Sequence, residues 1–186
     1  MKKKIIALLC AALTAISVCG CEAKHNTETY IKKTLFQDIP TFEVTSTSIK
    51  NGKWDKKIAN TAEGENISPE LSWEAVEGAE RYVVIMIDGV WLHMDVFTEE
   101  THLDEGSIQR GERGSQYVGP YPSPGHNHTY SVFVFALKGE SGKVPLAFDA
   151  GGNSIDLIWQ KLDTDKDGNR GNVLAYGRLD GDYKNK

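Results

Sequence analysis

Two segments of the chain are apolar on both sides of an extended backbone. Tyr82 to Ile87 (YVVIMI) is an uninterrupted apolar run, and Thr129 to Leu137 (TYSVFVFAL) places apolar residues on both faces. Successive side chains of a strand point to opposite faces, so a strand without a polar face is covered on both sides. We therefore expect both segments to be strands buried between two layers.

Shorter strand-like segments flank these two. β-Branched residues are frequent from Thr41 to Ile49, and the turn-forming pair Asn51-Gly52 follows. Met94 to Phe97 and Asn172 to Leu179 have the composition of two further strands. Several short strands separated by turn signals predict an all-β fold, a two-sheet antiparallel β-sandwich.

One segment has the periodicity of a helix. From Ser154 to Leu162, apolar residues recur at i, i+3, i+4 and i+7, starting at Ile155. Asn153 or Ser154 can cap the first turn, in which Asp156 is favourably placed. We expect this helix to lie against the sandwich, as one of one or two peripheral helices.

The first twenty residues have the pattern of an export signal. Lys2 to Lys4 precede an apolar stretch from Ile5 to Val18, and the small-residue segment Cys19-Gly20-Cys21 follows. This is the organisation of a secretory signal peptide, and the apolar stretch is shorter than the ~20 residues of a membrane span. The segment also resembles a bacterial lipobox, which makes Cys21 the expected lipidation site. A plain secretory signal with an incidental Cys21 is the alternative.

Cysteine usage and charge agree with an exported, tethered domain. All 3 cysteines lie within the first 21 residues, so the rest of the chain has no disulfide to form. The formal charge of −5 argues against a nucleic-acid partner, which would need a basic surface. We expect an extracytoplasmic lipoprotein at the cell membrane, with residues 1–20 as signal peptide, 21–40 as polar linker and 41–186 as one domain.

Three stretches of the domain carry residues suited to ligand binding: Gly64 to Trp73, Asp88 to Met94, and Gly119 to Tyr130. In the second, an acid ends a buried strand and His93 follows; in the third, a proline-stiffened loop leads to His128 at the start of a strand. Taken alone, the second stretch is more simply explained as a hairpin in which Asp88 bonds the turn amides. The third is more simply explained as a loop whose histidine is hydrogen-bonded to backbone.

Together, the order and spacing of these stretches resemble the phosphatidylethanolamine-binding protein family, whose bacterial branch is also called Raf-kinase-inhibitor-like. The element G-x-N-x-S-P-x-L-x-W occurs at Gly64 to Trp73, and W-x-H occurs at Trp91 to His93. The element G-P-x-P-x-P-G, followed by H-x-Y, occurs at Gly119 to Tyr130. The resemblance extends from about Phe42 to Tyr183, which is nearly the whole expected domain.

This resemblance implies a small pocket that takes phosphate, acetate or a phospholipid headgroup, without a cofactor or a metal. Carried over to this chain, the ligand-binding residues would be Asp88, His93, Gly119, Pro120, His128 and Tyr130. The two histidines would donate hydrogen bonds to the anion oxygens. Asp88 would fix a histidine tautomer or accept from an ammonium group, and backbone amides near Gly119 would complete the cradle. Tyr130 would form a wall or add a hydroxyl donor.

The chain departs from the family pattern in two places. Only Gly89 and Val90 separate Asp88 from Trp91, where family members usually have a second acid and prolines. Thr129 follows His128, where many members have an arginine. We therefore expect a shorter and more open pocket rim, with less positive charge to hold phosphate.

Three classes of function follow from these observations. The leading hypothesis is a non-catalytic, membrane-tethered protein that binds a small anion or a phosphorylated headgroup. The second is a protein-interaction role as a kinase or protease inhibitor, although a cytoplasmic kinase conflicts with an export signal. The third is a hydrolase that uses His93 and His128, with Asp88 as the orienting group. No serine or cysteine nucleophile lies in a recognisable motif, which argues against an enzyme.

Two metal hypotheses have weak support in the sequence. Two histidines and an acid can form a facial triad, but nothing else in the chain indicates a metal. Asp163 to Asn169 matches the beginning of a calcium loop, yet the twelfth position holds Leu174 instead of a glutamate. We therefore expect that run to be a polar turn. His126, two residues before His128, is expected to be solvated.

Overall fold

The computed structural model describes residues 36, 38–111 and 113–186 of the chain. The expected signal peptide, the lipidation site Cys21 and most of the expected linker lie outside the described residues. No helix in the part that the structure describes is long and apolar enough to cross a membrane.

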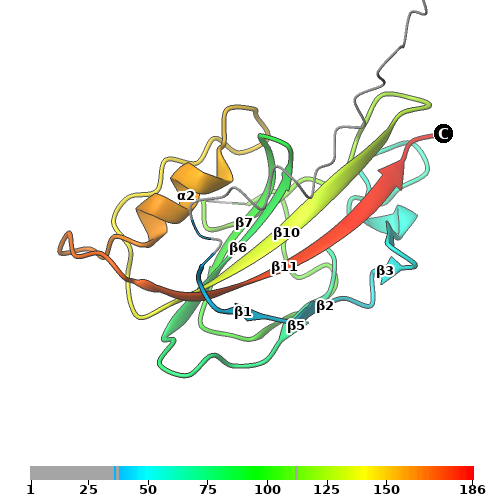
Figure 1. Ribbon diagram of the computed structural model, residues 1–186. Helices are drawn as coiled ribbons and strands as arrows, with labels where there is room; N and C mark the ends of the chain where they lie inside the picture. Colours follow the sequence, from blue (N-terminus) through cyan, green and yellow to red (C-terminus); the bar gives the residue numbers. More distant parts are fainter. Residues whose placement is uncertain (1–35, 37, 112) are drawn as a thin grey trace, which may run out of the picture.

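A large and mostly antiparallel sheet forms the centre of the molecule (Figure 1). Its strand order is β3-β4-β11-β10-β6-β7-β9, and β1 pairs with β11 outside this path. The bounds are Thr41–Phe42 for β1, Ile49–Lys50 for β3, Lys53–Trp54 for β4, Arg81–Asp88 for β6, Trp91–Thr98 for β7, Ser115–Tyr117 for β9, Asn127–Leu137 for β10 and Val173–Lys184 for β11. The predicted strands at 82–87, 94–97 and 129–137 are confirmed, and the last strand extends beyond the predicted Leu179.

A second, smaller sheet covers one face of the first. It consists of β2 (Val44–Thr45), β5 (Leu71–Trp73) and β8 (His102–Leu103), in the order β2-β5-β8. A short 3₁₀ helix, η1 (Lys56–Ile58), follows β4. The two layers confirm the predicted β-sandwich architecture.

The segment from Thr41 to Ile49, predicted as one strand, is instead divided between the two sheets. Its first residues pair with β11, Val44 pairs with Trp73 of β5, and Ile49 pairs with β4. The chain turns between the second and third parts, where the Ser46 hydroxyl donates to the Glu70 carbonyl (2.5 Å) and accepts from the Ser48 amide (3.1 Å). A strand that changes sheets in this way forms a corner of a sandwich.

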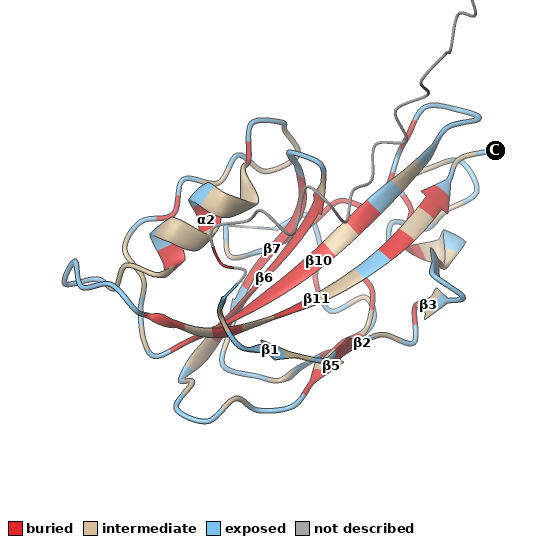
Figure 2. Ribbon diagram, viewed as in Figure 1, coloured by how far each residue is buried: buried red, intermediate tan, exposed pale blue. Residues whose placement is uncertain are grey.

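The central strands carry one hydrophobic core on each face, which makes β6 and β10 buried along most of their length (Figure 2). Alternate residues, among them Tyr82, Val84, Val132 and Val134, face the small sheet. The residues between them, among them Val83, Ile85, Phe133 and Phe135, face helix α2 (Ile155–Leu162) and Phe36. The prediction that both strands are covered on both sides is therefore confirmed.

The expected helix is present, and its buried face contains Ile158 and Leu162. Ser154 is its N-cap residue but forms no side-chain cap hydrogen bond. The Asn153 side chain instead bonds the backbone of Ala147 and Ala150, so it fastens the preceding loop.

The acidic run after α2 is a polar turn. The Asp165 carboxylate accepts from the amides of Asp167 (2.9 Å) and Asn169 (2.8 Å) and from the Asn169 side chain (3.0 Å). Its oxygens are thus occupied by the turn itself. Among the described residues, no group of three or more acids, histidines or cysteines is arranged to hold a metal ion.

Candidate functional site

The β6–β7 hairpin brings Asp88 and Trp91 together at one end of the large sheet. Gly89 forms the turn with φ 58°, a left-handed conformation that glycine adopts without strain. Behind the turn, Ile87 pairs with Leu92 while Met86 pairs with Met94, so His93 is the extra residue of a β-bulge. A bulge changes the direction of the side chain that it carries. This irregularity places the imidazole of His93 at the site.

His93 is a buried histidine, with 3% of its surface exposed. Its Nδ1 lies 3.0 Å from the Val118 carbonyl oxygen, which can only accept, so Nδ1 carries the proton. Burial lowers the pKa of His93, and the Val118 carbonyl and the Asp88 and Asp149 carboxylates offset this only in part. At neutral pH the ring is therefore neutral, and its Nε2 is a hydrogen-bond acceptor.

His128 and Asp88 form the second polar pair of the site. β6 and β10 are antiparallel neighbours, so the end of β6 lies next to the start of β10. Asp88 Oδ2 lies 2.5 Å from His128 Nδ1, and both side chains are partly exposed. The carboxylate thus orients the imidazole, which is one of the two roles that the family resemblance implies for Asp88.

These residues line a cavity of about 300 Å³ with aromatic walls. The Tyr130 ring packs edge-on against His93 at 5.0 Å and is stacked with His128 at 6.4 Å. Tyr121 contacts His93 at 5.4 Å and Trp91 at 6.3 Å. The structure thus brings together four of the predicted site residues, which are Asp88, His93, His128 and Tyr130.

Gly119 and Pro120 lie behind the cavity, and neither lines it. The Gly119 amide donates to the Asn66 side chain (2.7 Å), so this particular amide is not free to complete an anion cradle. A β-carbon on Gly119 would lie 2.0 Å from the Ile58 carbonyl oxygen. The Pro120 carbonyl accepts from the Asn60 amide (2.9 Å). These two residues position the wall that holds His93.

A second acid near the site comes from a segment that the sequence analysis did not single out. Asp149 accepts from the Tyr121 hydroxyl (2.6 Å) and from Arg110 (2.7 Å). Partial burial alone would raise the pKa of Asp149, but the hydrogen bonds from Tyr121, Arg110 and Trp91 lower it. Burial and then Asp149 raise the pKa of Tyr121 to about 12. The tyrosine therefore stays protonated and remains a fixed wall of the cavity.

No motif marks Asp149 in the sequence, since it lies in an irregular loop and depends on a side chain far away in the chain. Tyr121 was within reach of sequence reasoning, because it stands among the prolines of the Gly119 to Tyr130 stretch. Its orientation toward His93 follows only from the path of that loop.

The cavity has no fixed positive charge of its own. Among the described residues, no lysine or arginine lines it, and the guanidinium of Arg110 is engaged with Asp149. The groups that can become positive there are the imidazoles of His93 and His128. An oxyanion without a proton of its own is therefore held best in this cavity when at least one imidazole is protonated, so that its Nε2–H can donate to the anion.

The same arrangement offers a place for a cation. Asp88 provides a carboxylate, and the faces of Trp91, Tyr121 and Tyr130 attract positive charge. A zwitterion with an oxyanion at the histidines and an ammonium group at Asp88 would satisfy both halves of the site.

Comparison with known proteins gives a consistent result. The family model described as phosphatidylethanolamine-binding protein matches residues 45–183. A UPF0098 protein of Aquifex aeolicus is 35% identical over 165 residues, covering 76% of this chain and 88% of the relative. A UPF0098 protein of Methanothermobacter thermautotrophicus is 29% identical over 147 residues, covering 67% of this chain and 87% of the relative.

Two solved structures are similar in fold. One is a phosphatidylethanolamine-binding protein homologue of Chlamydia trachomatis, with a TM-score of 0.57. The other is YbcL of E. coli, described as a member of the mammalian PEBP family, with a TM-score of 0.58. Each is 24% identical to this chain, and each match covers 78% of this chain and 99% of the other.

Proposed function

Because this chain belongs to the phosphatidylethanolamine-binding protein family, we propose that it is a binding protein that holds a small oxyanion or a phosphorylated headgroup. The observation that carries the proposal is that His93 and His128, 35 positions apart in the sequence, line one cavity of about 300 Å³ and pack against the same tyrosine. Phosphate, acetate and a phosphorylated headgroup all present oxygens that two imidazolium donors can bind.

A bound anion favours the charged form of the His93 imidazole. The burial that keeps His93 neutral is opposed once a negative charge lies beside its Nε2. Binding is therefore coupled to the uptake of a proton. A ligand that brings its own proton, such as a monoanionic phosphate, can donate it to Nε2 and meet the same requirement.

Asp88 restricts which anions suit the cavity. A carboxylate at the rim repels a purely anionic ligand, whereas an ammonium group on the ligand turns this repulsion into attraction. The cavity is therefore better matched to a zwitterion such as phosphoethanolamine than to inorganic phosphate.

The proposed role is non-catalytic. Acid–base residues alone do not make an enzyme, and the two imidazoles are engaged with Asp88 and with the Val118 carbonyl. In the described part of the chain, no serine or threonine hydroxyl is hydrogen-bonded to either ring, so no activated nucleophile accompanies them.

The proposed place of action is the outer side of a cell membrane. Lysines at the N-terminus, the following apolar stretch and Cys21 in a lipobox-like segment support a lipid anchor for an extracytoplasmic domain. An acyl anchor would hold the binding site near a lipid surface, which is where phosphorylated headgroups are found.

Isothermal titration of the full chain with phosphoethanolamine tests the proposal. We expect binding in the wild type, loss of binding in His128→Ala, and unchanged binding in His126→Ala. His126 is a matched control because it is exposed and lies two residues away without lining the cavity. Binding that survives in His128→Ala with wild-type affinity would remove the site assignment.

A further inference from the structure

A second cavity, of about 290 Å³, lies on the α2 side of the large sheet and gathers positive charge. Its walls include Arg81, Arg113 and Lys143, together with the ring of Phe97 and, among the described residues, a single carboxylate, Glu140. We propose that this cavity is a second binding site, which takes a small polyanion such as a diphosphate or a dicarboxylate. The inference is independent of the proposed function, since none of these residues lines the first cavity.

The three cationic side chains of the cavity come from three separate segments of the chain. Arg81 begins β6 and lies on the same face as Val83, which pairs with Phe97 of β7. Arg113 precedes Gly114, whose backbone packs so closely on Phe97 that a β-carbon there would lie 2.9 Å from the ring. Lys143 comes from the loop after β10. The cavity is therefore formed by the fold and not by a run of basic residues.

The charge balance at this cavity is opposite to that of the chain. The described part of the lining holds three cations and one carboxylate, whereas the whole chain has a formal charge of −5. Glu140 lies 3.7 Å from Arg81 and 3.7 Å from Lys166, and its side chain is about half exposed. Ion pairs this long and this exposed are weak, so a ligand can compete with Glu140 for Arg81.

Arg81 also has a donor that the protein leaves unused. Its Nε is buried and has no hydrogen-bond partner among the described residues. A buried donor without an acceptor is unfavourable, and it would gain one if Arg81 shifted on binding so that its Nε met a ligand oxygen. Arginine is suited to this role because its planar fork binds phosphate and carboxylate oxygens in pairs.

The buried acid near Arg113, Asp95, does not occupy the guanidinium that a ligand would bind. Asp95 accepts from the Gly114 amide (2.8 Å) and the Gln116 side chain (2.6 Å), so both of its oxygens are occupied. Burial raises the pKa of Asp95, and the hydrogen bonds from Gly114 and Gln116 and the charge of Arg113 only partly oppose this. Within the part of the chain that the structure describes, no ion pair engages Arg113, so its exposed guanidinium remains available to a ligand.

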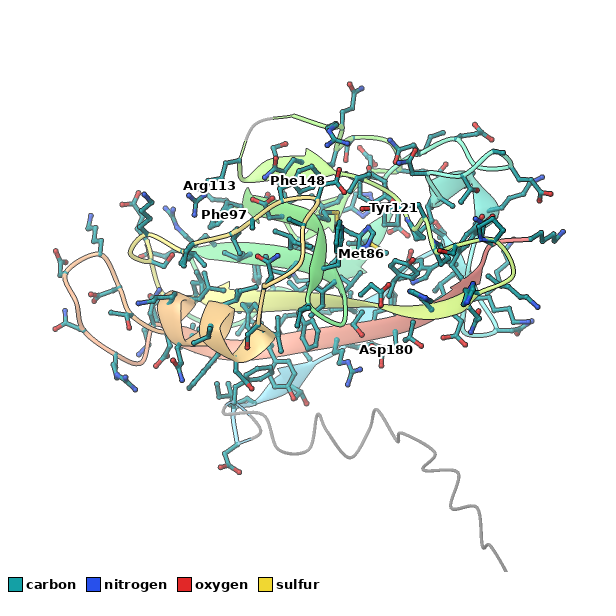
Figure 3. The ribbon with its side chains drawn as sticks, turned by 90° about the horizontal axis from the view of Figure 1, so that it is seen from above. Met86, Phe97, Arg113, Tyr121, Phe148 and Asp180 are labelled. Carbon is teal, nitrogen blue, oxygen red and sulfur yellow. The ribbon has the colours of Figure 1, made fainter. Side chains whose placement is uncertain are left out.

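Phe97 gives the cavity one apolar wall, against which an apolar part of the ligand can pack. Phe97 is 37% exposed, which leaves an apolar wall beside the charged groups. Figure 3 shows Phe97 and Arg113 near one another and Tyr121, a wall of the first cavity, farther along the molecule. Trp91 and Phe97 are six positions apart on β7, so the two sites are separated by roughly 20 Å.

Titration of the full chain with inorganic pyrophosphate, and separately with malonate, tests the proposal. The experiment is done in the His128→Ala background, which removes the first site. We expect Arg81→Gln and Arg113→Gln each to weaken binding about tenfold, the loss of one charge-assisted hydrogen bond. Glu140→Gln should strengthen binding, because it removes the competing carboxylate. Lys50→Gln is the matched control, since Lys50 is exposed and lies at the other edge of the sheet.

The comparison of the two probes identifies the ligand class: tighter binding of pyrophosphate indicates a phosphorylated ligand, and tighter binding of malonate a dicarboxylate. Both outcomes support the site. The proposal is overturned if neither probe binds in the His128→Ala background, or if binding is the same in the arginine variants and in Lys50→Gln. Should Arg81→Gln fail to fold, the opposite effects expected of the exposed pair Arg113→Gln and Glu140→Gln decide the question.

Discussion

The Asp88 carboxylate and the His128 imidazole lie 2.5 Å apart, although 40 positions separate them in the chain. The pairing exists because the end of β6 and the start of β10 are neighbours in an antiparallel sheet. Among the described residues, only one oxygen of this carboxylate has a hydrogen-bond partner, so the other can accept from a ligand. Asp88 therefore orients a histidine and can also select the charge of what binds beside it.

This dual role of Asp88 predicts a change in selectivity. Asp88→Asn keeps the shape of the side chain but removes the charge that would attract an ammonium group. The affinity for phosphoethanolamine divided by the affinity for phosphate should fall about five- to tenfold, which corresponds to ~1 kcal/mol. Taking the ratio cancels any effect on the histidines, which act on both ligands alike.

Calorimetric titration of wild type and Asp88→Asn with both ligands at one pH measures this ratio. Asp182→Asn is a control for the loss of one carboxylate, because Asp182 bonds Thr129 and does not line the cavity. An unchanged ratio in Asp88→Asn would mean that the ammonium group does not lie at Asp88.

The buried His93 predicts that anion binding depends on pH. Burial holds the pKa of His93 below its usual value, so the free protein is unprotonated there at neutral pH. Asp88 and Asp149 raise the pKa without reversing the shift, and Tyr121 and Tyr130 stay neutral because their pKa values are raised. Binding must supply the proton, so affinity should rise as the pH falls, by at most about tenfold per pH unit for one proton.

Sulfate is a suitable probe because its charge is constant between pH 5.5 and 8. We expect its affinity to increase from pH 8 to pH 6 and to level off below the pKa of free His93. His93→Gln, whose amide can still donate to the Val118 carbonyl, should flatten the profile. Sulfate affinity that is equal at pH 6 and pH 8 in the wild type would exclude proton uptake.

The same shift predicts an effect on stability, with a definite sign. A histidine whose pKa is lowered by folding binds its proton more readily in the unfolded chain, so its contribution to folding declines as the pH falls below about 6.5. The free energy of unfolding should decrease less between pH 7 and pH 5 in His93→Gln than in the wild type. Urea unfolding at the two pH values measures this difference, and an equal decrease in both proteins would contradict the assigned burial effect.

Gly119 should be needed for packing. In Gly119→Ala the new β-carbon would meet the Ile58 carbonyl oxygen at 2.0 Å and the Asn60 nitrogen at 2.8 Å, both of which belong to backbone. Backbone cannot move aside as a flexible side chain does, so we expect a loss of about 3 kcal/mol or more in the free energy of unfolding.

Gly125→Ala provides the comparison for that loss. Gly125 has φ 82° but nothing within 4 Å of its β-carbon position, so only the backbone strain of about 1–2 kcal/mol applies. Urea unfolding of both variants separates the two causes. A smaller loss in Gly119→Ala than in Gly125→Ala would contradict the packing role.

The sequence predicts the central strands well because burial on both faces leaves a local pattern. Phe133 and Val134 belong to opposite cores, and both are apolar whatever lies beyond them. The segment from Thr41 to Ile49 has no such constraint. Its division between two sheets depends on hydrogen bonds to Glu70, which is more than 20 positions away, and no local pattern records a contact of that kind.

The residues of the site also fall into two groups, those that a local motif predicts and those that depend on contacts between distant segments. His93 and His128 could be selected from their motifs, because the spacing of Trp91, His93, His128 and Tyr130 is a property of the chain itself. The occupied amide of Gly119 and the second acid, Asp149, could not be selected, since both depend on which loop meets which. The β-bulge that directs His93 into the cavity is likewise visible only in the strand pairing.

The central claim is that one anion contacts both imidazoles, and NMR of the histidine ring resonances during a sulfate titration at pH 6 tests it most directly. The account predicts that the signals of His93 and His128 shift together with one apparent affinity, while those of His102 and His126 stay in place. Signals of His93 and His128 that do not move, or that move with different affinities, would contradict it.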